Sequence, residues 1–371
     1  MTRTRAARGH ARSNTVQALA QKICFTAAAL YAALLVPLAL DGAPALFAAW
    51  APPVGHAREL LGGYALAVVT GYLVGRPAPG QLVALCVSWL LARLGWLLDP
   101  GGAWAVASQA LFALVFTASL APKFIGRGRR WRNLAIAPLL ALMAAASVAL
   151  DGALGLLPAA RDVMLLALAA LLAFMGGRLL APALATQLER DGTPPQARLQ
   201  PRLEGTVMAL LALAMVLAAS GLAPWLAGAC TMAAGATVAL RLARWRVWRC
   251  RGRGDLWCLA AGHAWLAFGL LAYGHALGGA SASAPGAHLL TVGALGTFSF
   301  NVMLRARLQR LRRDPARAAL LPAGTLLIAL ATLARGIAPA LDAAPAQALM
   351  ALAAAAWSLA FIALARRLLR A

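Results

Sequence analysis

Clusters of arginine and lysine alternate with long apolar stretches along this chain, and an even number of stretches separates each cluster from the next. The clusters lie at 123–132, 241–253, 305–317 and 366–370, and a further basic segment runs from residue 3 to 22. Because basic residues are retained on the cytoplasmic side of a bilayer, apolar stretches that occur in pairs between charge blocks indicate spans that cross and return. The pattern therefore predicts a polytopic membrane protein with both termini in the cytoplasm.

Twelve apolar spans can be drawn between these clusters, so the sequence predicts an all-α fold, a membrane helix bundle of about 12 transmembrane helices. A bilayer core of roughly 30 Å needs about 20 helical residues. In this topology nearly all of the 34 lysines and arginines fall on the cytoplasmic side. The predicted spans are 23–40, 60–74, 82–98, 104–120, 134–150, 163–180, 207–222, 225–240, 256–273, 288–304, 319–333 and 346–365.

The chain is predicted to form one membrane domain preceded by a short arm. Residues 1–22 make a basic cytoplasmic arm, and residues 23–371 make the membrane domain. The longest cytoplasmic connection, 182–205, holds three prolines and falls at the midpoint of the chain. Since proline-rich polar segments are typical of connections, it is interpreted as a linker between two six-helix halves, 23–181 and 206–365.

The composition excludes several other classes of protein. Charged residues make up 12% of the 371 residues, too few to cover the surface of a soluble protein, and the mean hydropathy is +0.75. The net charge of +23 follows from the basic cytoplasmic loops, so the expected partner is the lipid bilayer and not nucleic acid. The five cysteines show no C-x-x-C spacing, which argues against a disulfide framework or a cysteine zinc site. No motif of a catalytic nucleophile or acid–base pair occurs, so the chain is not expected to be an enzyme.

Histidine is scarce, which makes its placement informative. His10 lies in the basic arm, whereas the predicted topology places His56, His275 and His288 at the outer face of the membrane. His263 falls in the middle of the ninth span. An ionisable side chain at membrane depth is costly and marks a candidate functional site, although a neutral imidazole can also be satisfied by one hydrogen bond. His263 is therefore either a ligand or gate, or a packed core histidine.

Three charged residues accompany these histidines. Arg93 lies within the third span, about four residues from its outer end, where it could pair with Asp99 or bind a haem propionate. Glu59 begins the second span, where the simplest role for its carboxylate is to cap the helix. Arg58 could form an ion pair nearby or bind an anion.

Four stretches of the chain read as motifs. They are HARELLGGYALAVVTGYL at 56–73, MGGR at 175–178, a tryptophan-rich stretch at 245–266 that ends in GHAWL, and HLLTVGALGT through MLRA at 288–306. In this order they are similar to segments of the types HAHEMLFGFALAVIAGFL, MGGR, WxxWR…LHLGYAWL and HALTVGAIGT…MTRA. The chain therefore resembles the NnrS family, polytopic bacterial membrane proteins that are linked to nitric oxide and described as binding haem and copper.

The resemblance implies a multi-pass protein of the bacterial inner membrane that acts in the response to nitric oxide or nitrosative stress. It also implies a haem at the outer-facing histidines. The residues that would hold the cofactor are His56, His288, His263 and Arg93. The candidate metal ligands are His56, His288 and His275.

The chain departs from the family pattern where metal ligands would be expected. Arg58 stands in place of a second motif histidine, Ala260 stands in place of another, and the basic run 307–313 replaces a third. Only His56 and His288 match motif histidines directly. Because haem needs one or two axial ligands and copper favours several imidazole or sulfur ligands, haem is the expected cofactor and the ligand set for copper is incomplete.

Two further functions fit the same sequence. Twelve spans in two halves are a common outline of a small-molecule or metal transporter, although no pair of broken helices is recognised at matching positions of the halves. The loss of motif histidines also fits a divergent family member that binds no metal and serves as a membrane partner protein.

Overall fold

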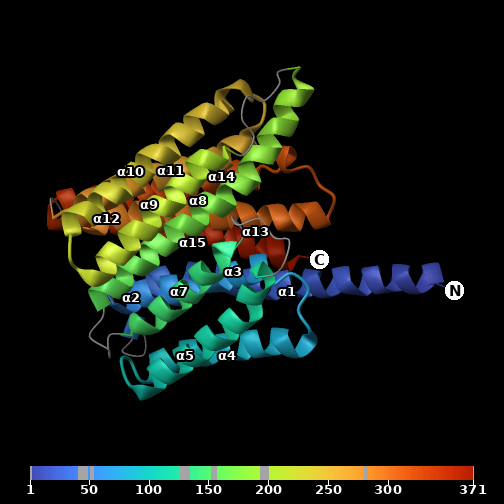
Figure 1. Ribbon diagram of the computed structural model, residues 1–371, viewed down its shortest axis with the longest axis horizontal. Coiled ribbons are helices and arrows are strands. Elements are labelled where there is room, and N and C mark those ends of the chain that lie inside the picture. The colour runs from blue at the N-terminus through green and yellow to red at the C-terminus, as the bar shows by residue number, and fades with distance from the viewer. Residues whose placement is uncertain are drawn as a thin grey trace. The chain divides into compact units, whose positions relative to one another are not determined.

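The computed structural model describes residues 2–40, 49–50, 54–125, 134–151, 157–192, 200–279 and 283–370. Within these ranges every regular element is a helix, which confirms the all-α fold (Figure 1). Ten of these helices are long and apolar enough to cross a membrane. The chain is therefore a multi-pass membrane helix bundle.

The described helices follow one another along the chain. The α-helices are α1 (Thr2–Leu40), α2 (Val54–Arg58), α3 (Leu66–Leu73), α4 (Pro79–Leu98), α5 (Ala103–Leu120), α7 (Ile136–Ala149), α8 (Leu157–Arg190), α9 (Pro201–Ser220), α10 (Pro224–Trp245), α11 (Gly254–Leu277), α12 (Ser283–His288), α13 (Gly296–Arg310), α14 (Leu320–Ile337) and α15 (Ala343–Leu369). Short 3₁₀ turns lie at Ala121–Phe124, Val247–Arg249, Pro315–Arg317 and Ala338–Ala340.

Helices occupy all twelve predicted span positions. The ten membrane-length helices account for ten of them, and the fifth is α7, an apolar helix of 14 residues. The second is a composite helix, in which α2 continues through the π-helical segment η2 (Glu59–Ala65) into α3. The tenth has the same build, with α12, the π-helical segment η5 (Leu289–Leu295) and α13. Segment η5 begins directly after His288, and η2 begins three residues after His56. Turns of π-helix are frequent at functional sites.

Prolines and a glycine set several helix boundaries. The helices α4, α9 and α10 each begin with a proline, whose missing N–H is not needed at the first helical position. Helix α9 ends at Ser220 and is capped by Gly221, which adopts a left-handed conformation with a φ of 66°. The predicted basic arm is helical from Thr2 and continuous with the first span. The linker predicted at 182–205 begins inside α8 and ends inside α9, and its role as a divider between two halves stays a prediction.

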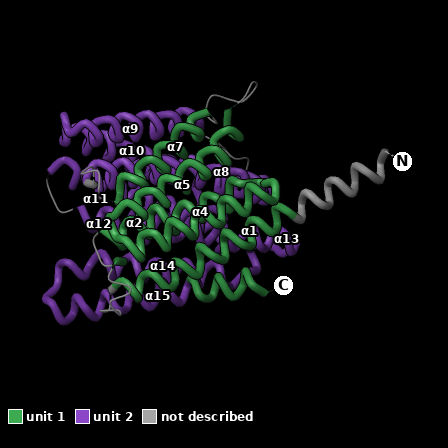
Figure 2. The backbone as a smooth tube through the Cα atoms, turned by 90° about the horizontal axis from the view of Figure 1, so that it is seen from below, with its two compact units in different colours: residues 1–157, 361–371 green, residues 158–360 purple. Residues whose placement is uncertain are grey.

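The chain forms two compact units, which Figure 2 shows in different colours. The first unit comprises residues 1–157 and 361–371, and the second comprises 158–360. The composite helix with η2 belongs to the first unit, and the composite helix with η5 belongs to the second. Each unit therefore carries one π-helical segment beside one candidate histidine.

Small residues allow the helices of the second unit to pack closely, as the abundance of glycine and alanine predicts for a membrane bundle. Helices α10 and α11 meet at Gly228 and Gly274. A Cβ atom on Gly274 would lie 2.7 Å from the carbonyl oxygen of Gly228, and a Cβ on Gly228 would lie 2.7 Å from the amide nitrogen of Gly278. The two backbones are thus in direct contact.

Candidate cofactor site

His288 is a candidate histidine whose hydrogen bonding leaves one ring nitrogen available to be a ligand. It is the last residue of α12, and η5 begins directly after it. Its Nδ1 lies 2.6 Å from the carbonyl oxygen of Ala284. Because a carbonyl can only accept, Nδ1 carries the proton and Nε2 is left with a lone pair. This is the tautomer that histidine ligands adopt when a backbone carbonyl orients them.

The helix that carries His288 runs antiparallel to α11. Gly286 lies against Tyr273, where an added Cβ would be 2.7 Å from the Tyr273 Cα. Four residues further along, Leu290 lies against Gly269, with its amide nitrogen 3.0 Å from where a Cβ would be. Residue numbers rise along one helix as they fall along the other, so the two helices are antiparallel. The two contacts also define which residues lie at the same level.

This register brings His275 and His288 to the same end of the second unit. His288 lies level with residue 271, which is about one helical turn, or roughly 6 Å along the axis, from His275. The side chain of His275 is exposed and that of His288 is half-buried. Arg335 of α14 is near enough to His288 for their charges to interact. Two imidazoles and one guanidinium therefore gather at this end of the unit.

His263 lies apart from that end and is closed in. It is twelve residues from His275 on α11, about 18 Å along the helix axis, and its side chain is 1% exposed. Its Nδ1 lies 3.1 Å from the carbonyl oxygen of Leu259. The rings of Trp245 and Phe298 pack against the imidazole with centroids 5.0 and 4.9 Å away. The imidazole is thus enclosed between two aromatic rings, which is the environment of a packed core histidine.

Replacement of His263 by phenylalanine is therefore expected to be tolerated. Its Nε2 has no hydrogen-bond partner among the described residues, so an aromatic ring of similar shape removes an unsatisfied polar atom from the core. We expect the midpoint of thermal unfolding in detergent to change little. Replacement by alanine should instead leave a cavity between the two aromatic rings and lower the free energy of unfolding by about 3 kcal/mol.

The two histidine variants should be compared in the same detergent and at the same protein concentration. A loss of stability in the phenylalanine variant as large as that in the alanine variant would mean that the imidazole nitrogen has a role that the packing does not explain.

The MGGR motif packs against a buried ion pair in the second unit. Arg241 donates to Glu204 at 2.8 Å and to the carbonyl oxygen of Ala173 at 3.0 Å. A Cβ on Gly177 would lie 2.9 Å from the Cζ of Arg241, so Gly177 packs directly against the guanidinium where it crosses α8. Arg178 of the motif lies 3.8 Å from the same glutamate. The motif thus has a structural role that the sequence did not indicate.

Glu59 is the centre of a second buried ionic cluster, in the first unit. Its side chain is 0% exposed and accepts hydrogen bonds from Arg58, Arg93 and Tyr31, with 2.7 Å between the Arg93 Nη1 and the carboxylate. The expectation that Glu59 simply caps a helix was wrong, because α2 and η2 are continuous across it. Arg93 pairs with Glu59 and not with Asp99.

Arg58 joins this cluster to the connection that follows α7. Its Nε donates to Asp151, and its guanidinium lies over the Trp96 ring, 4.5 Å from the centroid. Gln109 accepts from both Arg58 and Arg93. Burial raises the pKa of the Asp151 carboxyl above its usual range, although the charge of Arg58 opposes that rise. Arg58 therefore forms the ion pair that the sequence allowed, and its partners come from η2, α4, α5 and the connection after α7.

The comparison with known proteins decides the family. The sequence model described as NnrS protein matches residues 15–371. The chain belongs to the NnrS family. No curated protein and no solved structure matches it.

The NnrS family implies two cofactors, haem and copper, and each needs particular ligand side chains. The described residues contain no group of three or more histidine, cysteine, aspartate or glutamate side chains that could hold a metal ion. The described residues therefore do not fit a copper site with three or more such ligands. A haem with one histidine ligand needs only one free imidazole nitrogen, which His288 supplies.

His56 belongs to the first unit. It lies in α2, three residues before η2, and its side chain is half-buried. Its grouping with His275 and His288 on one outer face stays a prediction, as do the cofactor roles of His56 and Arg93. The sequence did not indicate that Arg335 lies near His288, because the two residues are 47 positions apart and only the packing of α14 brings their charges together.

Proposed function

We propose that this protein acts in the bacterial inner membrane in the response to nitric oxide, and that it binds a haem through the Nε2 of His288. The observation that supports this proposal is the hydrogen bond of 2.6 Å from His288 Nδ1 to the Ala284 carbonyl, which leaves Nε2 free. Membership of the NnrS family supports the link to nitric oxide.

The residues around His288 have complementary roles in this proposal. His288 would hold the haem, which would supply an iron able to bind a diatomic gas. The Ala284 carbonyl fixes the tautomer of His288 and raises the basicity of Nε2. The positive charge of Arg335 suits a propionate group, because charge-assisted hydrogen bonds to carboxylates are strong. His275, about one turn away, is the nearest second imidazole on α11.

The optical spectrum of protein purified after expression with added haem precursor tests the ligand. We expect a Soret band in the wild-type protein and its loss in His288→Ala. The matched controls are His10→Ala, in the basic arm, and His263→Phe, in the closed core, which should both retain the band. A wild-type protein without haem, or a Soret band that is unchanged in His288→Ala, would contradict the proposed ligand.

Growth under a nitric oxide donor tests the function separately. Cells that lack this protein should be more sensitive to the donor, and the wild-type gene should restore growth. We expect His288→Ala to fail to restore it, whereas His10→Ala should succeed. Restoration by His288→Ala at normal expression would favour a membrane partner protein that does not need the haem. Equal growth with and without the protein would overturn the link to nitric oxide.

A further inference from the structure

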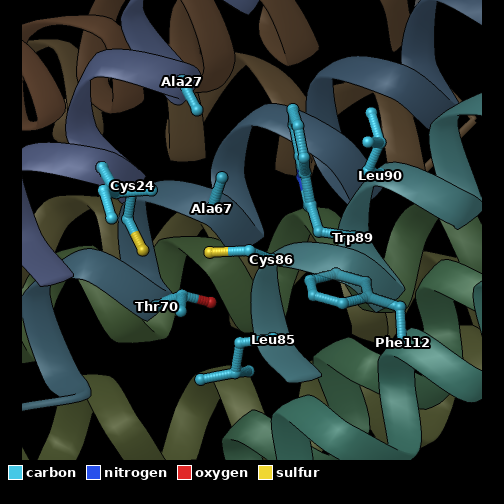
Figure 3. A pocket seen from close by; sticks show the side chains of 10 residues that line it. Cys24, Ala27, Ala67, Thr70, Leu85, Cys86, Trp89, Leu90 and Phe112 are labelled. Carbon is cyan, nitrogen blue, oxygen red and sulfur yellow. The ribbon is translucent and has the colours of Figure 1, made fainter. Parts of the chain in front are cut away.

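Two cysteine thiols meet inside the first unit. Cys24 lies on α1 and Cys86 lies on α4, and both side chains line the same pocket. Figure 3 shows the two sulfur atoms turned toward one another at a pocket. Cys24 is 7% exposed and Cys86 is half-buried, so the pair is largely shielded from the surroundings. Residues 62 positions apart in the sequence are thus held together by the fold.

The pocket beside the thiols is almost entirely apolar. It has a volume of about 170 Å³, and its two other polar side chains already have hydrogen bonds within the protein. The Thr70 hydroxyl donates to the Leu66 carbonyl at 2.7 Å, and the Trp89 indole donates to the Gly63 carbonyl at 3.0 Å. The thiols are therefore the polar groups that remain for a bound molecule.

The rim of the pocket faces the surroundings through apolar side chains. Ile23 is 40% exposed and Leu90 is 52% exposed. Cys24 lies eight residues into the span Val16–Ala39, and Cys86 lies seven residues into α4, so each is about 10–12 Å from the start of its helix. At that depth the exposed apolar rim contacts lipid, and a molecule that reaches the pocket must be soluble in the bilayer.

Two kinds of chemistry suit a pair of thiols, and the surroundings distinguish them. A soft metal ion such as Cu(I) would need both thiols deprotonated, which leaves a net negative charge on the site. No basic side chain lines the pocket to offset that charge, and an uncompensated charge at membrane depth is costly. A disulfide is neutral, as is the dithiol from which it forms. The apolar surroundings therefore favour redox chemistry over metal binding.

We propose that Cys24 and Cys86 form a redox-active dithiol that a lipid-soluble quinone oxidises to a disulfide. The two S–H bonds break and one S–S bond forms, while two electrons and two protons pass to the quinone, which leaves as the hydroquinone. The site stays neutral throughout. A cavity of about 150 Å³ accommodates a benzene ring, so this pocket admits the six-membered ring of a quinone. The proposal does not rest on haem binding or on the response to nitric oxide.

In the experiment, the full-length reduced protein in detergent is treated with tetramethyl-1,4-benzoquinone. This quinone is chosen because all of its ring carbons are substituted, so thiols cannot add to the ring. We expect maleimide labelling after denaturation to find three free thiols in place of the five cysteines of the sequence. Peptide mapping should find the Cys24 peptide linked to the Cys86 peptide. Hydroquinone should form in an amount equal to the protein.

Single variants show whether the reaction belongs to this pair. Cys24→Ser and Cys86→Ser should each lower the hydroquinone yield at least tenfold. Cys230→Ser is the matched control, a buried thiol on α10 of the second unit, and should give the wild-type yield. Five thiols that persist in the treated wild-type protein would overturn the proposal, even if a variant fails to fold. A Cys24–Cys86 disulfide that forms with the water-soluble oxidant diamide and not with the quinone would overturn the lipid route.

Discussion

Replacement of Glu59 by alanine is expected to lower the free energy of unfolding by about 3–5 kcal/mol, the range found when one partner of a buried ion pair is removed. The carboxylate is fully buried and accepts from Arg58, Arg93 and Tyr31. Without it, two guanidinium groups remain in the interior of the first unit with one buried acid, Asp151, beside them. The midpoint of unfolding in detergent, by heat or by added dodecyl sulfate, measures the effect.

Two comparisons make this result specific to the buried cluster. Asp342→Ala removes an exposed carboxylate ahead of α15 and should change the stability by less than about 0.5 kcal/mol. Glu59→Gln keeps the shape and one acceptor oxygen, so its loss of stability should lie between those of the two alanine variants. If Glu59→Ala unfolds at the same midpoint as Asp342→Ala, the cluster does not hold the first unit together.

Replacement of Gly228 by alanine is expected to cost about 3 kcal/mol, the upper end of the range for overpacking in a core. The added methyl group would overlap the backbone of α11, 2.7 Å from the Gly278 nitrogen. Backbone atoms of a packed helix cannot rotate aside as a flexible side chain can, so α10 and α11 must separate along their length. The thermal unfolding midpoint should fall, and the second unit should become more sensitive to proteases.

A helical glycine with free space around it provides the control. A Cβ on Gly336 of α14 would meet no atom within 4 Å. Since alanine is favoured over glycine in a helix by up to about 1 kcal/mol, Gly336→Ala should leave the stability unchanged or raise it. Equal midpoints for Gly228→Ala and Gly336→Ala would show that the close contact of α10 and α11 is not needed for stability.

The positions of the helices could be predicted from the sequence because they depend on local properties. Each span is an apolar run long enough for a bilayer, and hydropathy measures that directly. The order and number of the spans follow from the same pattern, and proline and glycine mark several of the boundaries. The family could also be identified, because its motifs are continuous stretches of sequence.

The buried ion pairs could not be predicted, because their partners are distant in sequence. Arg58 and Asp151 are 93 residues apart, and Arg241 and Glu204 are 37 residues apart. The sequence shows that a charge lies near the end of a span, but the nearest acid along the chain is not the one that the packing brings to it. For Arg93, the nearest acid along the chain is Asp99, but the acid with which it pairs in the structure is Glu59.

The candidate histidines were predicted in part. Their positions along the spans correctly separated His263, in the core of α11, from His275 and His288 at one end of the second unit. The sequence left open whether His263 is a ligand or a packed residue, and the rings of Trp245 and Phe298 around it favour packing. The tautomer of His288 depends on one backbone carbonyl, which no sequence pattern reports.

The π-helical segments η2 and η5 have a consequence for how such chains diverge. A π turn holds one residue more than an α turn, so it shifts the angular phase of the helix by about one residue, or roughly 100°. His56 and Arg58 precede η2, and His288 precedes η5. The face of the helix on which each of these side chains lies, relative to the residues after the π segment, therefore depends on the extra residue. Deletion of one residue from either segment would turn these side chains to another face while every one of them stayed in the sequence.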